Sequence, residues 1–302
     1  FIPHTKKEIE EMIDDLGISS LDELFKDIPD EIKIKDELNL PKPSSELVIK
    51  NEIENIFSFN NLPKRIFLGG GVYNHFIPST VNYVLNRGEF YTSYTPYQPE
   101  LSQGTLTAIY EFQSYIVNLT GMDVSNASLY DGATATAEAV FMATSQTRRN
   151  KVLVSKTINP RILDVIKTYA KYRDIEIIVV DMVDFCLDKE DLRTKLTDDV
   201  AALVVQYPHY YGLIEDFQEV VDLVHNNKSL FIMNADPSTL SVLKTPGEVG
   251  CDIVCGEAQT LGIPLNFGGP YLGYMATTNK LLRKLPGRIV GMTNDVDGKR
   301  GY

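Results

Sequence analysis

The chain has 302 residues, 43% of them hydrophobic and 23% charged, and its formal charge is −12 because 41 acidic side chains outnumber 29 basic ones. This length is typical of about two domains, or of one large α/β domain with an appendage. The apolar fraction excludes disorder and collagen-like repeats. The acidic balance argues against nucleic acid as a partner. No apolar run approaches the roughly 18–20 residues of a membrane-spanning helix.

Residues 1–60 are predicted to form an N-terminal helical arm. Thr5 and Glu8 have the spacing of a capping box, which predicts a helix through Leu16 that Gly17 ends. A second short helix is expected over 20–25, a proline-containing linker over 30–45, and a third helix from Ser45 to Phe57. Such short helices bury little apolar area alone, so we expect the arm to pack on the main body or on a partner.

From about residue 61 the sequence alternates helical patterns with short apolar runs. The expected helices cover 103–119, 135–149, 160–173, 188–196 and 215–226. The expected strands cover 151–155, 175–181, 200–206, 229–234, 252–255 and 271–276. The apolar runs are continuous, as in strands that are covered on both faces. Residues 61–302 are therefore predicted to form one mainly parallel sheet sandwiched by helices, an α/β fold.

The sequence contains three glycine clusters that could form either ligand-binding loops or simple turns. The run 68–72 fits a phosphate loop but lacks the Lys-Ser/Thr of a P-loop, so a flexible turn is the alternative. The segment 131–138 predicts either an anion site at a helix start or a simple N-cap at Thr134 or Thr136. The run 266–273 fits a tight turn that enters a strand.

The cysteines and histidines give no sign of a metal site. Cys186, Cys251 and Cys255 have no CxxC spacing and are expected to be buried free thiols in a reducing compartment. The four histidines, His4, His75, His209 and His225, are far apart in sequence. We therefore predict no metal ligands and a cytoplasmic location.

The segment 92–100, Thr-Ser-Tyr-Thr-Pro-Tyr-Gln-Pro-Glu, directly precedes the helix expected from Gln103. Its prolines stiffen the chain, and its tyrosines add rigid amphipathic rings. The segment is either a packed connection with satisfied polar tips or the wall of a site or interface.

The run from Phe90 to Gly104, which contains this segment, resembles the signature of the glycine cleavage system P-protein, and more narrowly subunit 1 of its two-subunit form. The likeness extends over the whole chain, in the strings 1–5, 20–25, 119–123, 206–208, 266–270 and 286–291. The resemblance implies the fold type I architecture of pyridoxal-phosphate (PLP) enzymes. It also implies glycine decarboxylation, with transfer of the aminomethyl group to the lipoyl arm of H-protein.

PLP chemistry needs a Lys, an acid for the pyridine nitrogen and an anion cradle for the phosphate. Asp236 follows an expected strand and matches the acid, and Thr134 matches the cradle, but the Lys position is held by Gln259. A Gln amide cannot form a Schiff base. We therefore expect a vestigial cofactor site, with PLP bound by subunit 2, as the resemblance also implies.

The expected role is that of a partner subunit in a heteromer, for which the resemblance suggests a two-plus-two heterotetramer. We predict that Tyr94, Thr95, Tyr97 and Gln98 reach toward the active site of subunit 2, with Tyr73 and His75 as weaker candidates. One alternative is a scaffold that only stabilises subunit 2. Another is a stand-alone PLP enzyme that uses an unrecognised Lys.

The ends of the sequence add a last expectation. The chain opens on Phe1 and stops at Gly301-Tyr302, where members of the resembled family continue into a smaller C-terminal domain. We expect a truncated subunit that lacks this domain.

Overall fold

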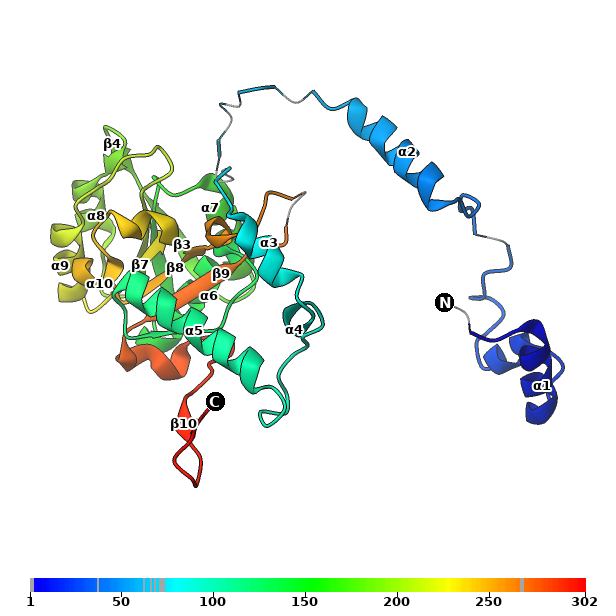
Figure 1. Cartoon of the computed structure of the whole chain (residues 1–302). Helices are drawn as coiled ribbons and strands as arrows, with labels where there is room; N and C mark the ends of the chain where they lie inside the picture. The colour runs from blue at the N-terminus through cyan, green and yellow to red at the C-terminus, as the bar shows by residue number, and fades with distance from the viewer. Residues whose placement is uncertain are drawn as a thin grey trace. The chain divides into compact units, whose positions relative to one another are not determined.

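The structure, a computed structural model, describes residues 3–36, 38–61, 63–65, 67, 69–70, 74–266 and 269–302 (Figure 1). The chain divides into two compact units, Phe1–Ile66 and Phe67–Tyr302. Within the described residues, no helix combines the length and apolarity needed to cross a bilayer.

The first unit contains α1 (Lys6–Leu16), the 3-10 helix η1 (Leu21–Phe25) and α2 (Glu46–Ser58). Thr5 caps α1 through a capping box with Glu8, and Gly17 ends the helix in the left-handed conformation, as predicted. No residue of these helices is buried. The unit therefore has no apolar core in its helices.

The second unit is built on a seven-stranded sheet of order β1-β9-β8-β7-β6-β2-β3. The strands are β1 (Val124–Ser125), β2 (Lys151–Ser155), β3 (Glu176–Val180), β6 (Val200–Tyr207), β7 (Leu230–Ala235), β8 (Ile253–Glu257) and β9 (Gly273–Thr277). Strands β3, β2, β6, β7 and β8 are parallel, whereas β9 and β1 are antiparallel to their neighbours. The predicted mainly parallel sheet is confirmed.

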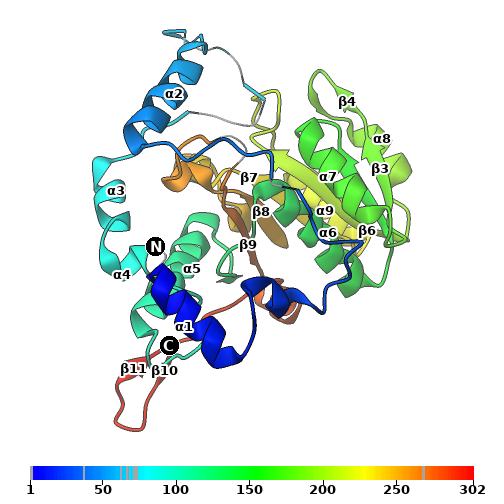
Figure 2. The same cartoon turned by 90° about the vertical axis from the view of Figure 1, so that its right-hand side faces the viewer.

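In the described part of this unit, three helices precede the first strand, and the others alternate with the strands. The helices are α3 (Ser79–Leu85), α4 (Gly88–Tyr91), α5 (Gln103–Thr120), α6 (Gly132–Thr147), α7 (Pro160–Ala170), α8 (Lys189–Lys195), α9 (Gln218–Asn226) and α10 (Pro246–Val249). The 3-10 helices of this unit include η2 (Pro237–Ser241), η3 (Gln259–Leu261) and η4 (Asn279–Lys284). Figure 2 shows α3 and α4 as successive short helices that lead to α5.

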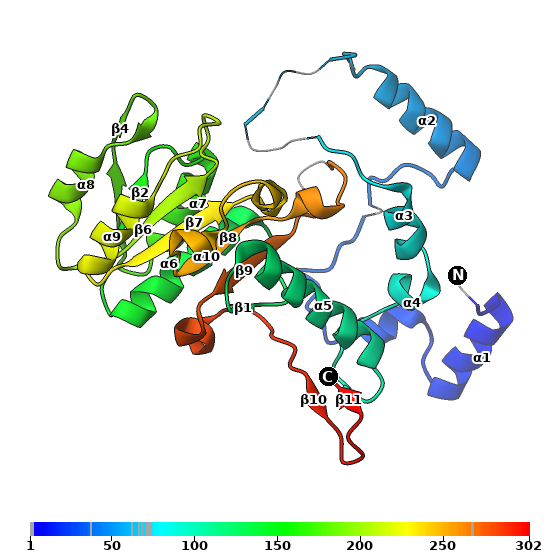
Figure 3. The same ribbon diagram turned by 60° about the vertical axis from the view of Figure 1, so that its left-hand side comes forward.

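Two small hairpins project from this framework. One consists of β4 (Met182–Val183) and β5 (Cys186–Leu187), and the other of β10 (Thr293–Asn294) and β11 (Arg300–Gly301). Figure 3 shows the second hairpin beside the start of α5. There the Gln103 amide donates to Tyr302 O at 2.9 Å and accepts from Tyr302 N at 3.0 Å.

Each face of the sheet has its own core. Side chains such as Leu203 and Phe231 pack with α5, α8 and α9 on one face. Their neighbours Val204 and Ile232 pack with α6, α7 and η4 on the other. Since successive strand residues point to opposite faces, both sets must be apolar. This explains the unbroken apolar runs of the sequence.

Candidate functional site

Two adjoining cavities lie at the carboxyl ends of the parallel strands, where α/β folds bind their ligands. One has a volume of about 320 Å³ and the other about 480 Å³. Both are lined by Asn159, which follows β2, by Asn234 of β7, and by Glu257 and Gln259 at the end of β8. Because of these shared residues, we treat the two cavities as one site.

Glu257, the last residue of β8, anchors the site. One carboxylate oxygen accepts the amide of Gly132, the first residue of α6, at 2.9 Å. The other accepts the amides of Gln259 at 3.0 Å and Leu272 at 2.9 Å. A helix N-terminus attracts anions through its free N–H groups and its dipole. The carboxylate of Glu257 therefore occupies the place that a free anion would take.

Burial raises the pKa of Glu257, and the hydrogen bonds from Leu272, Gly132 and Gln259 oppose that rise. Strand β8 can lie this close to the start of α6 only because residue 132 is glycine. A Cβ at this position would lie 2.5 Å from Glu257 N and 2.8 Å from the carbonyl carbon of Gly256. Gly132 and Glu257 thus form a tightly fitted pair.

Gln259, at the predicted Schiff-base position, is buried in η3. Its side-chain amide donates to Ile263 O, so it is tied to the backbone of its own turn. Asp236, at the predicted acid position, is the N-cap of η2. Its Oδ1 accepts from Ser238 N at 2.9 Å and from Thr260 Oγ1 at 2.7 Å. Both side chains have local structural partners.

The start of α6 differs from the prediction. The N-cap is Asp131, not Thr134 or Thr136, and the helix begins at Gly132 rather than at residue 135. Thr134 is the third helical residue and completes a capping box with Asp131. Thr136 accepts the Asn234 side-chain amide at 2.7 Å. Ala-rich composition marks the middle of this helix well but not its first turn, because an Asp-Gly pair is equally typical of a turn.

The loop before α5 carries the other predicted site residues. Tyr94 and Tyr97 are 84% and 72% exposed, and Thr95 and Gln98 are exposed as well. The guanidinium of Arg288 lies 5.3 Å from the ring centre of Tyr97. None of these four loop residues lines the two cavities, so the described part of the chain does not join the loop to Asp236 and Gln259.

Of the weaker candidates, His75 lines the larger cavity. Tyr73 lies outside the described residues, as do Leu68, Gly71 and Val72 of the first glycine cluster and Phe267 and Gly268 of the third. Sequence reasoning missed Glu257. The only available signal was its place, directly after an apolar strand and two residues before Gln259.

The parallel sheet and the site at its carboxyl edge define the class of protein: the large domain of fold type I PLP-dependent enzymes. A sphingosine-1-phosphate lyase structure from Burkholderia pseudomallei matches with a TM-score of 0.60 at 12% identity, over 89% of this chain and 65% of that one, and shows the fold. The predicted fold class is confirmed.

The comparisons then identify the family. The profile of the glycine cleavage system P-protein matches residues 1–302. A crystal structure of glycine decarboxylase (P-protein) in inhibitor-bound form matches with a TM-score of 0.92 at 40% identity, over all of this chain and 68% of that one. Probable glycine dehydrogenase (decarboxylating) subunits 1 match over 100% of this chain and 68% of their own length. They are 48% identical in Listeria monocytogenes and 47% in Carboxydothermus hydrogenoformans.

The chain belongs to the glycine cleavage system P-protein family, and it is an enzyme subunit of the decarboxylating glycine dehydrogenase type. The resemblance found in the sequence is confirmed.

Proposed function

We propose that this chain acts as subunit 1 of a heteromeric glycine dehydrogenase in which a separate subunit 2 holds PLP. Together the subunits decarboxylate glycine and pass its aminomethyl group to the lipoyl arm of H-protein. The cofactor supplies the electron sink for that reaction. This chain contributes the walls that exclude water and orient glycine or the lipoyl arm.

The carboxylate of Glu257 carries the first part of this proposal. It already neutralises the N-terminus of α6 through Gly132, and its negative charge would repel a phosphate at the same place. Gln259 offers no amine for a Schiff base. Oδ1 of the acid Asp236 already accepts hydrogen bonds from Ser238 and Thr260. The residues present therefore do not fit PLP, and we regard Thr134, Asp236 and Gln259 as a vestigial cofactor site.

The exposure of the loop 94–98 supports the second part. Tyr94, Thr95, Tyr97 and Gln98 present rings, a hydroxyl and an amide on a segment stiffened by Pro96 and Pro99. Rigid polar and aromatic groups of this kind suit an interface or the wall of a neighbouring active site. We propose that they border the active site of subunit 2.

The cofactor assignment is tested with the purified chain and PLP. We expect no cofactor absorbance band and no label retained after borohydride reduction, while subunit 2 treated in the same way retains both. A stoichiometric, borohydride-trapped adduct on this chain would instead support a stand-alone PLP enzyme.

The loop is tested in the reconstituted complex by the double variant Tyr97→Phe, Gln98→Ala, with glycine-dependent CO2 exchange in the presence of H-protein as the assay. We expect turnover to fall at least tenfold while size-exclusion chromatography shows unchanged assembly. Tyr172→Phe, at another exposed tyrosine, is the matched control. Unchanged turnover in the double variant would favour the scaffold role.

The proposal extends to the arm and to the location. The arm, residues 1–60, exposes Leu24, Phe25 and Phe57, apolar side chains that a partner subunit would cover. We propose a cytoplasmic location, where a reducing environment would keep the three cysteines as free thiols; Cys251 and Cys255 are buried as predicted, whereas Cys186 is only partly buried. A two-plus-two heterotetramer is the assembly we propose.

A further inference from the structure

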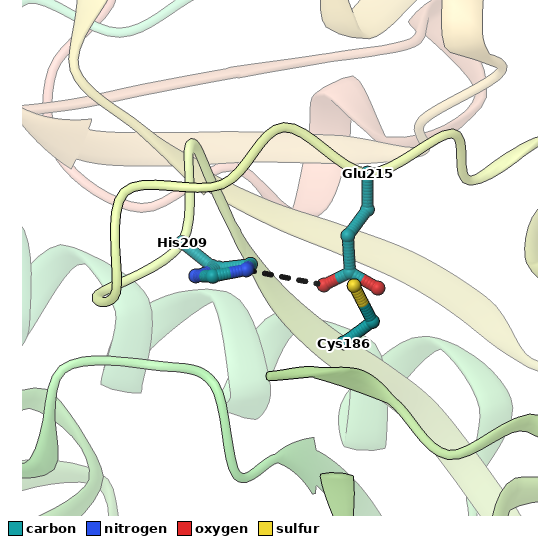
Figure 4. Close-up of side chains that lie close together, drawn as sticks. All are labelled: Cys186, His209 and Glu215. Carbon is teal, nitrogen blue, oxygen red and sulfur yellow. Dashed lines mark ion pairs between the residues drawn. The ribbon is translucent and has the colours of Figure 1, made fainter. Parts of the chain in front are cut away.

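Three side chains converge beside β6, and of these only His209 also lines the site described above. Cys186 belongs to β5, His209 follows β6, and Glu215 lies in the loop before α9. One ligand atom from each lies within 4.8 Å of the others (Figure 4). Thiol, imidazole and carboxylate are the three side-chain groups that zinc binds most often.

Two of these groups each have one buried atom without a hydrogen-bond partner. His209 Nε2 and Glu215 Oε1 have no partner among the described residues, and their side chains are 0% and 11% exposed. They face each other at 3.9 Å, which is too far for a hydrogen bond. Unsatisfied buried polar atoms are rare in native proteins, and an ion is one established explanation for them.

The surroundings hold these groups in place. The second carboxylate oxygen of Glu215 accepts the amide of Leu187, the residue after Cys186, at 2.8 Å. His209 N donates to Leu213 O at 3.2 Å, and Gly212 N donates to His209 O at 2.8 Å. The bond to Glu215 is of the kind that orients the ligands of metal sites, and the two backbone bonds fix the turn that carries His209.

We propose that Cys186, His209 and Glu215 form a binding site for a divalent transition metal of the zinc class. Bonds of about 2.0–2.3 Å place the ligand atoms of a tetrahedron roughly 3.3–3.8 Å apart. The 3.9 Å between Nε2 and Oε1 is close to that spacing, and both lie within 4.8 Å of the Cys186 sulfur, which would have to move closer to them on binding. Sulfur and nitrogen ligands disfavour Mg²⁺ and Ca²⁺, which prefer oxygen.

Metal binding requires one local change. Tyr211 N donates to His209 Nδ1 at 3.1 Å, which places the proton of the neutral ring on Nε2. A metal on Nε2 moves that proton to Nδ1, so the Tyr211 amide must turn away. The loss of one backbone hydrogen bond is small beside the binding free energy of a site with three protein ligands. Burial lowers the pKa of His209, which keeps the ring in the neutral form that binds metals.

The site would fasten the β4–β5 hairpin to the loop after β6. That loop includes His209 and Tyr210, which line the larger cavity. Three protein ligands leave the fourth tetrahedral position to water or a small ligand. We assign the metal a structural role, in which it fixes the wall of the cavity.

The test uses the 302-residue chain freed of metal by a chelator and then dialysed against Zn²⁺ or Co²⁺. We expect one metal per chain and, with Co²⁺, a thiolate-to-metal charge-transfer band. Bound Zn²⁺ should also slow the reaction of Cys186 with a thiol reagent at least tenfold. A chain that binds no stoichiometric metal, or binds Co²⁺ without the thiolate band, overturns the proposal without any variant.

Variants then assign the ligands. Cys186→Ser and Glu215→Gln should each weaken Zn²⁺ binding at least tenfold, with circular dichroism confirming the fold. His225→Gln is the matched control, because His225 and Asp252 form a separate pair at 2.8 Å that only adventitious binding would use. Affinity that is unchanged in both ligand variants, or is lost in the control, refutes the assignment.

Discussion

Replacing Glu257 by Ala should destabilise the second unit, because the carboxylate satisfies three backbone amides. These belong to Gly132, Gln259 and Leu272. An amide left buried without a partner costs about 1–3 kcal/mol. Water that enters the cavity of about 320 Å³ offsets part of that loss. The removal of a buried charge offsets a further part. We expect a net loss of about 3 kcal/mol in the free energy of unfolding.

For a domain of this size, each kcal/mol corresponds to a Tm shift of about 2–4 °C, so the variant should melt about 6–12 °C lower. Thermal unfolding followed by circular dichroism measures this shift. Glu111→Ala, at an exposed position of α5, is the control and should change stability by less than about 0.5 kcal/mol. A Glu257→Ala variant with the Tm of the wild type would refute the assigned role of the carboxylate.

The same residue should respond to pH. Burial raises the pKa of Glu257 in the folded chain above its ordinary value. The folded state then holds its proton more tightly than the unfolded state, so the stability from this group is present below the unfolded pKa and is lost as pH rises through the folded pKa. The free energy of unfolding of the wild type should therefore fall relative to that of Glu257→Gln as pH rises from about 4.5. A wild type that gains stability relative to this variant over the same range would contradict this sign.

Three further predictions concern the same framework. Gly256→Ala should lower the free energy of unfolding by about 3 kcal/mol, because a Cβ there would lie 2.0 Å from Ala235 O on the adjacent strand. Chemical denaturation measures this loss, and a variant with the midpoint of the wild type would contradict the prediction. Asp131→Ala removes the N-cap of α6 and should cost about 1 kcal/mol, whereas Asp131→Asn should largely restore it. In metal-free native protein a thiol reagent should react with Cys186 alone, because Cys251 and Cys255 are buried. Burial also raises the pKa of Cys255 to about 12. Rapid reaction of all three thiols would refute this prediction.

The sequence by itself determined the long elements and the sheet class of the second unit. The strand predicted over 151–155 is β2 without any change, and the helix predicted from Gln103 is α5, one residue longer than expected. These predictions succeeded because the spacing of apolar residues and the glycines that end helices are local signals in the sequence. Short elements such as β1 and the β4–β5 hairpin were missed, because they depend on pairing with distant strands or on turn geometry.

The sequence also showed that Gln259, at the position proposed for the Schiff-base Lys, offers no amine whatever the fold. Only the tertiary structure decided which group binds the N-terminus of α6. Glu257 and Gly132 are 125 residues apart, and no local pattern pairs them. The same holds for Cys186, His209 and Glu215, which have no metal-ligand spacing along the chain and meet only because β5 and the loop after β6 are folded against each other. The sequence specifies which side-chain groups are present, but the packing of the folded chain sets the distances between them.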